Sequence, residues 1–291
     1  MVYPELFNIG PFTVHSYGLM LGIAFIVASW ILTRELRRKN LDPNFSTEIT
    51  LLAIIFGIAG SKIAHLIANP SEFAADPVGS LFSPGGLTFH GGLILATIAI
   101  YIFVKRKGIP FLFIADSAAP SLAIAYGIGR IGCHLSGDGD YGLPTNLPWG
   151  VNYENGIVQP SLMFAGSDIA RAFPNGIVPD NTPLHPTPIY EFLLMGIIFL
   201  ILWKLRTKAM PDGFLFSLYL LLAGFERLMI EFIRLNPKLL FGLSEAQLVA
   251  TGLIIAGGYG VFYFSKNKDL PKYSPPQHLQ PKVEPKKSKN K

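Results

Sequence analysis

The run ERLMIEFIR carries Arg227, Glu231 and Arg234 at spacings of four and then three residues. In a helix these spacings put the three side chains on one face. Such a face could form an internal Arg-Glu-Arg network that neutralises itself. It could also bind an anion, because planar guanidinium groups donate paired hydrogen bonds to phosphate oxygens.

Arg130 and Lys62 favour the anion-binding interpretation, because each lies in or beside a different apolar stretch. A charged side chain inside a membrane costs about 2.5–3.5 kcal/mol by insertion scales, so each needs a partner. Cations contributed by separate spans are harder to neutralise with the nearby acids. The phosphate of a lipid would neutralise them from the outer leaflet.

His90 is the candidate for proton transfer. Imidazole titrates near neutral pH, and we expect the following Gly91 and Gly92 to leave room for a substrate. A lone histidine in a membrane is otherwise expected to be a hydrogen-bonded structural residue.

Apolar stretches long enough to cross a bilayer must position these groups. The sequence is 50% hydrophobic and only 15% charged, with a mean hydropathy of +0.41, which is typical of a membrane protein. A hydrocarbon core of roughly 30 Å needs about 20 apolar residues. Seven such stretches predict an all-α integral membrane protein with seven transmembrane helices, near residues 14–32, 49–68, 86–104, 111–131, 189–205, 213–232 and 246–264.

The distribution of basic residues orients these spans. Lysines and arginines gather in RELRRK, KRK, KLRTK and the C-terminal tail, whereas the alternate loops hold only Arg171, Arg234 and Lys238. The positive-inside rule therefore predicts an external N-terminus and a cytoplasmic C-terminus. In this topology Lys62, His90, Arg130 and Arg227 lie toward the outer leaflet.

Outside the spans, two segments differ in composition. Residues 132–185 are rich in Gly, Pro and Asn, and we expect them to form a small extracytoplasmic head or arm within a membrane domain of residues 1–265. Residues 266–291 are rich in Pro and Lys and are expected to form a disordered cytoplasmic tail. The single cysteine, Cys133, excludes an internal disulfide, and the dispersed basic clusters do not favour nucleic acid as a partner.

Five segments together resemble the phosphatidylglycerol–prolipoprotein diacylglyceryl transferase family of bacteria. They are HSYG at 15–18, FHGG at 89–92, GRIG at 129–132, HPTPIYE at 185–191 and ERLMIEFIR at 226–234. The sequence departs from the family after GRIG, where Cys133, His134, Ser136 and Asp138 stand at the family's Asn, Phe, Asn and Glu positions. An extra residue precedes Gly142, so the chain is expected to be a divergent member.

The resemblance implies a transferase of the bacterial cytoplasmic (inner) membrane that acts in lipoprotein biosynthesis. It joins the lipobox cysteine thiol of a prolipoprotein to the diacylglyceryl group of phosphatidylglycerol and releases glycerol phosphate. Arg130 and Arg227 are the expected phosphate ligands, with Lys62 as a weaker third, and His90 is the expected base. The expected supporting residues are Asp138, Glu191 and Glu231, which would orient the cations, and Tyr17 and Tyr190, which would bind headgroup or interface.

We expect no cofactor and no metal, because the histidines lie on separate spans without HExxH-like spacing. The alternative function is a transporter or channel for an anionic solute or lipid. It predicts polar groups along the cytoplasmic halves of the spans as well, where Asp116 and Glu226 are the main acids.

Overall fold

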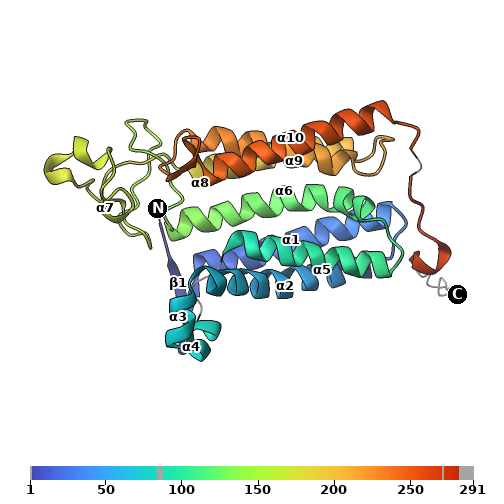
Figure 1. The fold of residues 1–291 in the computed structure, drawn as a ribbon, viewed down its shortest axis with the longest axis horizontal. Helices are drawn as coiled ribbons and strands as arrows, with labels where there is room; N and C mark the ends of the chain where they lie inside the picture. The colour runs from blue at the N-terminus through green and yellow to red at the C-terminus, as the bar shows by residue number, and fades with distance from the viewer. Residues whose placement is uncertain (1, 84–87, 271, 282–291) are drawn as a thin grey trace, which may run out of the picture. The chain divides into compact units, whose positions relative to one another are not determined.

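The computed structural model describes residues 2–83, 88–270 and 272–281. The chain divides into two compact units (Figure 1). Unit 1 comprises Met1–Ala28 and Asp116–Pro271, and unit 2 comprises Ser29–Ala115 and Lys272–Lys291.

Six helices in the described part of the chain are long and apolar enough to cross a membrane. They are α1 (Ser16–Arg38), α2 (Asn44–Ala68), α5 (Phe89–Arg106), α6 (Phe111–Ser136), α8 (Thr187–Leu205) and α10 (Glu245–Lys266). This is the architecture of an α-helical integral membrane protein. The expected span at 213–232 forms helix α9 (Phe214–Glu231), but it is not among the six because Glu226, Arg227 and Glu231 interrupt its apolar sequence.

In unit 1, α9 packs against both α8 and α10 (Figure 1). Small residues allow the close approach of α9 and α10, since a Cβ at Gly257 would lie 2.4 Å from the Leu221 backbone nitrogen. Asp116 of α6 accepts hydrogen bonds from the Gly213 and Phe216 backbone amides. These amides lie at the start of α9, where backbone N–H groups have no partner within the helix. Ser244 and Gln247 form a capping box at the start of α10.

The connection between α6 and α8 is folded around its own apolar cluster. The cluster contains Tyr141, Tyr153, Phe164, Val178 and Leu184. Short elements cover it, namely α7 (Pro160–Met163) and the 3-10 turns η1 (Ala170–Ala172) and η2 (Pro174–Gly176). The segment that the composition predicts to be a small head therefore begins after Ser136, because α6 extends five residues beyond the predicted end of its span.

Two antiparallel hairpins in unit 1 have no counterpart in the sequence prediction. Strands β1 (Glu5–Ile9) and β2 (Phe12–His15) precede α1, and β3 (Lys238–Leu240) and β4 (Leu243–Ser244) connect α9 with α10. The first long helix begins at Ser16, two residues after the predicted start near residue 14, because β2 continues to His15.

In unit 2, α2 and α5 pack closely through glycines. A Cβ at Gly91 would lie 2.3 Å from the Ala64 Cβ, and one at Gly92 would lie 2.3 Å from the Ser61 hydroxyl. The expectation that Gly91 and Gly92 leave room for a substrate is therefore wrong, because helix α2 fills that space. The connection from α2 to α5 contains α3 (Pro70–Ala75) and α4 (Pro77–Phe82).

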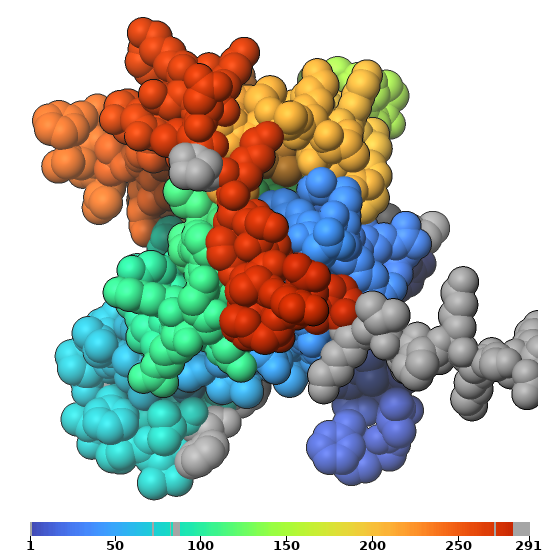
Figure 2. Space-filling view, turned by 90° about the vertical axis from the view of Figure 1, so that its right-hand side faces the viewer, coloured from blue at the N-terminus to red at the C-terminus, as the bar shows by residue number. Residues whose placement is uncertain are grey.

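Part of the C-terminal tail is also ordered within unit 2. A 3-10 turn, η3 (Gln277–Leu279), buries Leu279, whose carbonyl accepts a hydrogen bond from the Asp42 amide at 2.8 Å. In Figure 2 this red segment lies over the blue residues that follow α1. The expectation of a disordered tail from residue 266 does not hold for residues 272–281, because Leu279 and Tyr273 supply apolar contacts that the Lys- and Pro-rich composition conceals.

Candidate functional site: an arginine-carboxylate cluster

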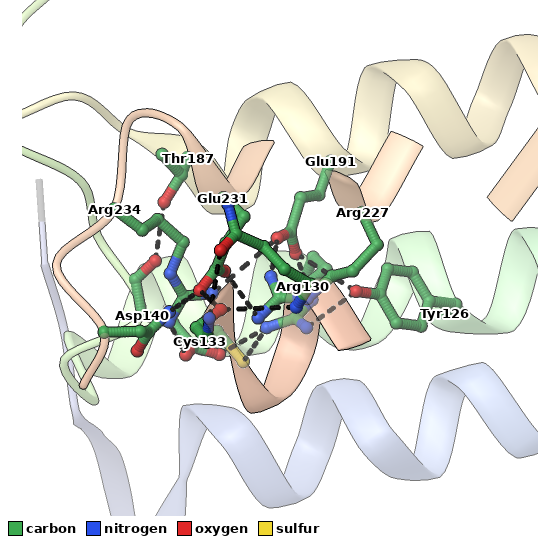
Figure 3. A network of polar contacts seen from close by, with 12 residues as sticks. Tyr126, Arg130, Cys133, Asp140, Thr187, Glu191, Arg227, Glu231 and Arg234 are labelled. Carbon is green, nitrogen blue, oxygen red and sulfur yellow. Dashed lines mark hydrogen bonds and ion pairs between the residues drawn. The ribbon is translucent and has the colours of Figure 1, made fainter. Parts of the chain in front are cut away.

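Glu191 is the centre of a charged cluster in unit 1 (Figure 3). It is fully buried. Its Oε2 forms an ion pair with the Arg130 Nε, and its Oε1 lies 3.0 Å from the Arg227 Nη1 and 3.7 Å from the Arg234 Nη1. One carboxylate thus holds three guanidinium groups together.

The order of the helices explains this meeting. Arg130 lies near the end of α6, Arg227 lies in the last turns of α9 and Arg234 follows that helix, whereas Glu191 lies in the second turn of α8. The ends of α6 and α9 and the beginning of α8 meet in unit 1 (Figure 3). Pro188 suits the start of α8, because a proline in the first turn needs no amide partner.

Asp140 binds two of the arginines. Its carboxylate forms ion pairs with Arg130 and with Arg234, and its backbone carbonyl accepts a hydrogen bond from the Thr187 hydroxyl at 2.6 Å. Burial disfavours the charged form, but the two guanidinium groups outweigh burial and hold the pKa of the Asp140 carboxyl well below its usual range. The sequence analysis missed Asp140 because the family motif was aligned to Asp138.

Asp138 does not have the predicted orienting contact. Among the described residues it forms no ion pair, and its Oδ1 accepts a hydrogen bond from the Asp140 amide at 3.2 Å. Burial and the neighbouring Asp140 carboxylate raise the pKa of Asp138. Asp140, two positions later, pairs with the arginines instead.

Glu231 links the cluster to the hairpin after α9. Its Oε2 lies 3.3 Å from the Arg227 Nη2. Its Oε1 accepts hydrogen bonds from the Asn236 amide, at 2.7 Å, and from the Ser244 hydroxyl. Glu191 and Glu231 therefore both contact the guanidinium group of Arg227.

The three arginines are matched by three carboxylates, those of Asp140, Glu191 and Glu231. The premise that these cations need an external anion for charge balance is therefore wrong, because Asp140 was not counted among the acids. Donor capacity nevertheless remains. The Nε and Nη1 of the nearly buried Arg234 have no hydrogen-bond partner among the described residues.

Tyrosines surround the cluster. The Tyr126 hydroxyl accepts a hydrogen bond from the Arg130 Nη2 at 2.7 Å and lies 3.4 Å from Glu191 Oε2. Tyr17 lies beside α6, since a Cβ at Gly132 would be 3.3 Å from its ring. The Tyr190 hydroxyl instead accepts a hydrogen bond from the Trp149 indole at 2.8 Å and lies 3.3 Å from the His185 Nδ1.

His90 and Lys62 belong to unit 2. His90 is exposed in the first turn of α5, where its ring lies edge-on to Phe89. Lys62 is buried and donates hydrogen bonds to the Ser83 carbonyl at 3.0 Å and to the Ser83 hydroxyl at 2.7 Å. These contacts give Lys62 a structural role in holding the end of α4.

Cys133, Asp138 and Asp140 lie close enough to share a metal ion, with their ligand atoms within 4.8 Å of one another. The electrostatics oppose this use. Asp140 already pairs with Arg130 and Arg234, so a cation would have to approach two guanidinium groups. We therefore assign no metal to these residues.

Taken together, the helices and this cluster define a multi-pass membrane protein with a buried, arginine-rich polar site. The comparisons with known proteins are more specific. The chain belongs to the prolipoprotein diacylglyceryl transferase family, because the model of that family matches residues 4–263. The family predicted from the five segments is thus confirmed.

Three relatives named phosphatidylglycerol–prolipoprotein diacylglyceryl transferase illustrate the similarity. The protein of Clostridium tetani is 32% identical over 264 residues, which cover 90% of this chain and 96% of the relative. That of Pseudomonas paraeruginosa is 31% identical, covering 88% of this chain and 93% of the relative. That of Chromohalobacter salexigens is 29% identical, covering 88% and 92%. The similarity extends over nearly the whole of each protein.

Proposed function

We propose that this protein transfers the diacylglyceryl group of phosphatidylglycerol to the lipobox cysteine thiol of prolipoproteins and releases glycerol phosphate. The observation that carries the proposal is the cluster of Arg130, Arg227 and Arg234 around Glu191, at the ends of apolar helices, in a chain that belongs to this family. The transporter alternative is not favoured, because the family and its relatives are named as transferases.

The proposed topology has seven spans. Helix α9 supplies the seventh, because its three charged side chains include Arg227 and Glu231, which pair inside the protein. The bias of basic residues toward RELRRK, KRK, KLRTK and the tail supports an external N-terminus and a cytoplasmic C-terminus in the bacterial cytoplasmic membrane. The cluster then faces the outer leaflet, where phosphatidylglycerol and the lipobox peptide enter from the bilayer.

The reaction is a substitution at carbon. The substrate thiol loses its proton, its sulfur forms a bond with the glycerol carbon, and the bond from that carbon to the phosphate oxygen breaks with its electron pair on the oxygen. The leaving phosphate gains negative charge, which guanidinium groups stabilise through charge-assisted hydrogen bonds. A guanidinium group next to the sulfur also favours the thiolate, whose reference pKa is about 8.5.

The observed contacts suggest how the arginines engage the phosphate. Arg130 already donates to Asp140, Glu191 and Tyr126, which leaves few of its five N–H groups for a phosphate oxygen. The Nε and Nη1 of Arg234 donate no hydrogen bond among the described residues, although Nη1 lies 3.7 Å from Glu191 Oε1. We propose Arg130 and Arg227 as phosphate ligands, Arg234 as a further one, and His90 as the acceptor of the thiol proton.

Tyr17 and Tyr190 are proposed to contact the lipid headgroup or the membrane interface. Tyr17 is the second residue of α1, and its ring lies against α6 at Gly132, close to Arg130. Tyr190 and Trp149 form a hydrogen-bonded aromatic pair at the start of α8, and such side chains favour the membrane interface. Lys62 retains a weaker proposed role as a third cation for the phosphate.

A transfer assay tests the proposal. Purified protein is incubated with phosphatidylglycerol and a lipobox peptide, and the mass of the peptide is measured. We expect a gain equal to one diacylglyceryl group in the wild type and its loss in Arg130→Ala. Arg171→Ala is the matched control, because Arg171 is exposed and pairs only with exposed Asp168 among the described residues. Anion flux into proteoliposomes without peptide modification would contradict the proposal.

A further inference from the structure

Glu226 is a buried carboxyl group that the proposed reaction does not use. It precedes Arg227 in α9, and only 5% of its surface is exposed. Neither of its side-chain oxygens has a hydrogen-bond partner among the described residues. An unpaired polar group in such a place is costly, so its state needs an explanation.

Titratable and charged groups face Glu226 from the elements around it. They are Tyr126 and Arg130 of α6, Glu191 of α8, Tyr219 and Arg227 of α9, and Arg234 beyond α9. Glu191 is the other carboxylate in this set. The remaining neighbour of α9 is α10, which packs against Gly224 through Ala250 and Ile254. The titratable residues of α10 are its first residue and residues among its last eight, so they lie away from these two contacts.

The charge balance of the cluster indicates which protonation state of Glu226 has the lower free energy. Arg130, Arg227 and Arg234 are already matched by Asp140, Glu191 and Glu231. An ionised Glu226 would give the cluster a net negative charge beside Glu191, without hydrogen bonds to compensate its burial. A neutral carboxylic acid avoids both costs.

We infer that Glu226 is a positioning residue that works as a neutral acid and keeps the arginine cluster from becoming negative, so that the phosphate of the lipid can bind. The inference rests on the proposed function only for the identity of the lipid. It predicts that loss of the Glu226 proton at higher pH weakens binding of the lipid phosphate, because a new negative charge then lies beside the arginines.

Binding of phosphatidylglycerol measured without peptide tests this inference. The Kd for short-chain phosphatidylglycerol is measured by titration calorimetry between about pH 6 and about pH 9, a range in which a buried carboxyl can titrate. We expect the Kd of the wild type to rise at least about tenfold across the range, as repulsion between nearby charges predicts. Glu226→Gln should bind as the wild type does at the low end and stay nearly constant.

Two further variants make the result decisive. Glu226→Met is a second neutral replacement, for use if the glutamine variant does not fold, and it should give the same flat profile. Glu48→Gln removes an exposed carboxyl of α2 and should keep the wild-type profile. Weak binding by both neutral variants at about pH 6, or a wild-type pH dependence in either, would overturn the inference. Failure of the transfer assay with these binding profiles intact would instead count against the proposed reaction.

Discussion

The polar groups of the two units are stabilised in different ways. In unit 1, Arg130, Arg227 and Arg234 share the carboxylate of Glu191, and Arg130 and Arg234 also share that of Asp140. In unit 2, Lys62 binds the hydroxyl and carbonyl of Ser83, and His65 contacts Asn69 one helical turn away. Shared partners couple the arginines to one another, so we expect substitutions in unit 1 to affect several residues at once and those in unit 2 to act locally.

The largest difference should appear when one cation is removed from each unit. Arg227→Ala should lower the transfer rate about 10³-fold, as the loss of a donor to a developing anion does. Lys62→Ala should lower it less than about tenfold, because Lys62 already binds Ser83. Initial rates at saturating lipid measure both effects. Equal losses would erase the proposed distinction between the units.

Glu191→Gln tests the coupling within unit 1. The substitution leaves three guanidinium groups around a neutral amide, and removing one partner from a buried ion pair costs about 3–5 kcal/mol of folding stability. Thermal unfolding in detergent should show a much lower midpoint than for Glu154→Gln, which changes an exposed head residue. Similar midpoints for the two variants would show that Glu191 does not hold the cluster together.

His90→Gln tests whether a residue of unit 2 affects the transfer rate without affecting the stability of the fold. If His90 accepts the thiol proton, kcat should fall about 10²-fold, the lower range for general base catalysis. The unfolding midpoint should not change, since His90 is exposed. His65→Gln serves as the control. A kcat within threefold of the wild type, about 0.7 kcal/mol, would remove His90 from the mechanism and leave activation of the thiol to the arginines.

Asp140→Asn should have the smallest effect, and one that depends on pH. Because the arginines depress the pKa of Asp140 in the folded protein, its contribution is present above the usual carboxyl range and is lost as the pH falls through the depressed value. We expect a loss of about 1–2 kcal/mol at neutral pH, with allowance for partial exposure. The difference from wild type should shrink in strongly acidic buffer. A difference that grows as the pH falls would contradict the assigned ion pairs.

The lengths of the apolar runs predicted the helices well, because a chain that crosses a bilayer as a single segment satisfies its backbone hydrogen bonds as a helix. The limits of the seven runs agree with the helices to within a few residues, apart from longer ends such as Arg38 and Ser136. The hairpins were missed because β1 and β2 are short and lie next to an apolar span. The order seen in residues 272–281 was missed because it depends on the few contacts of Leu279 and Tyr273.

The composition of the site was only partly predictable. The helical spacing of Arg227 and Glu231 placed both on one face, and the five segments selected Arg130 and Glu191. Asp140 was missed because the family motif was aligned to Asp138, and sequence spacing does not determine which loop carboxylate reaches an arginine. The role expected of Gly91 and Gly92 was wrong because a glycine pair can serve either helix packing or access, and only the neighbouring helix decides.

The central claim, that the arginine cluster grips the phosphate of the lipid, can be measured directly by solid-state NMR. Protein with ¹⁵N-labelled arginine side chains is reconstituted with phosphatidylglycerol, and dipolar coupling between ³¹P and the guanidinium nitrogens is recorded. Direct hydrogen bonds predict couplings for separations of about 4 Å or less. We expect this coupling in the wild type and its loss in the Arg130→Lys, Arg227→Lys, Arg234→Lys triple variant. Coupling that persists unchanged in the triple variant would contradict the account.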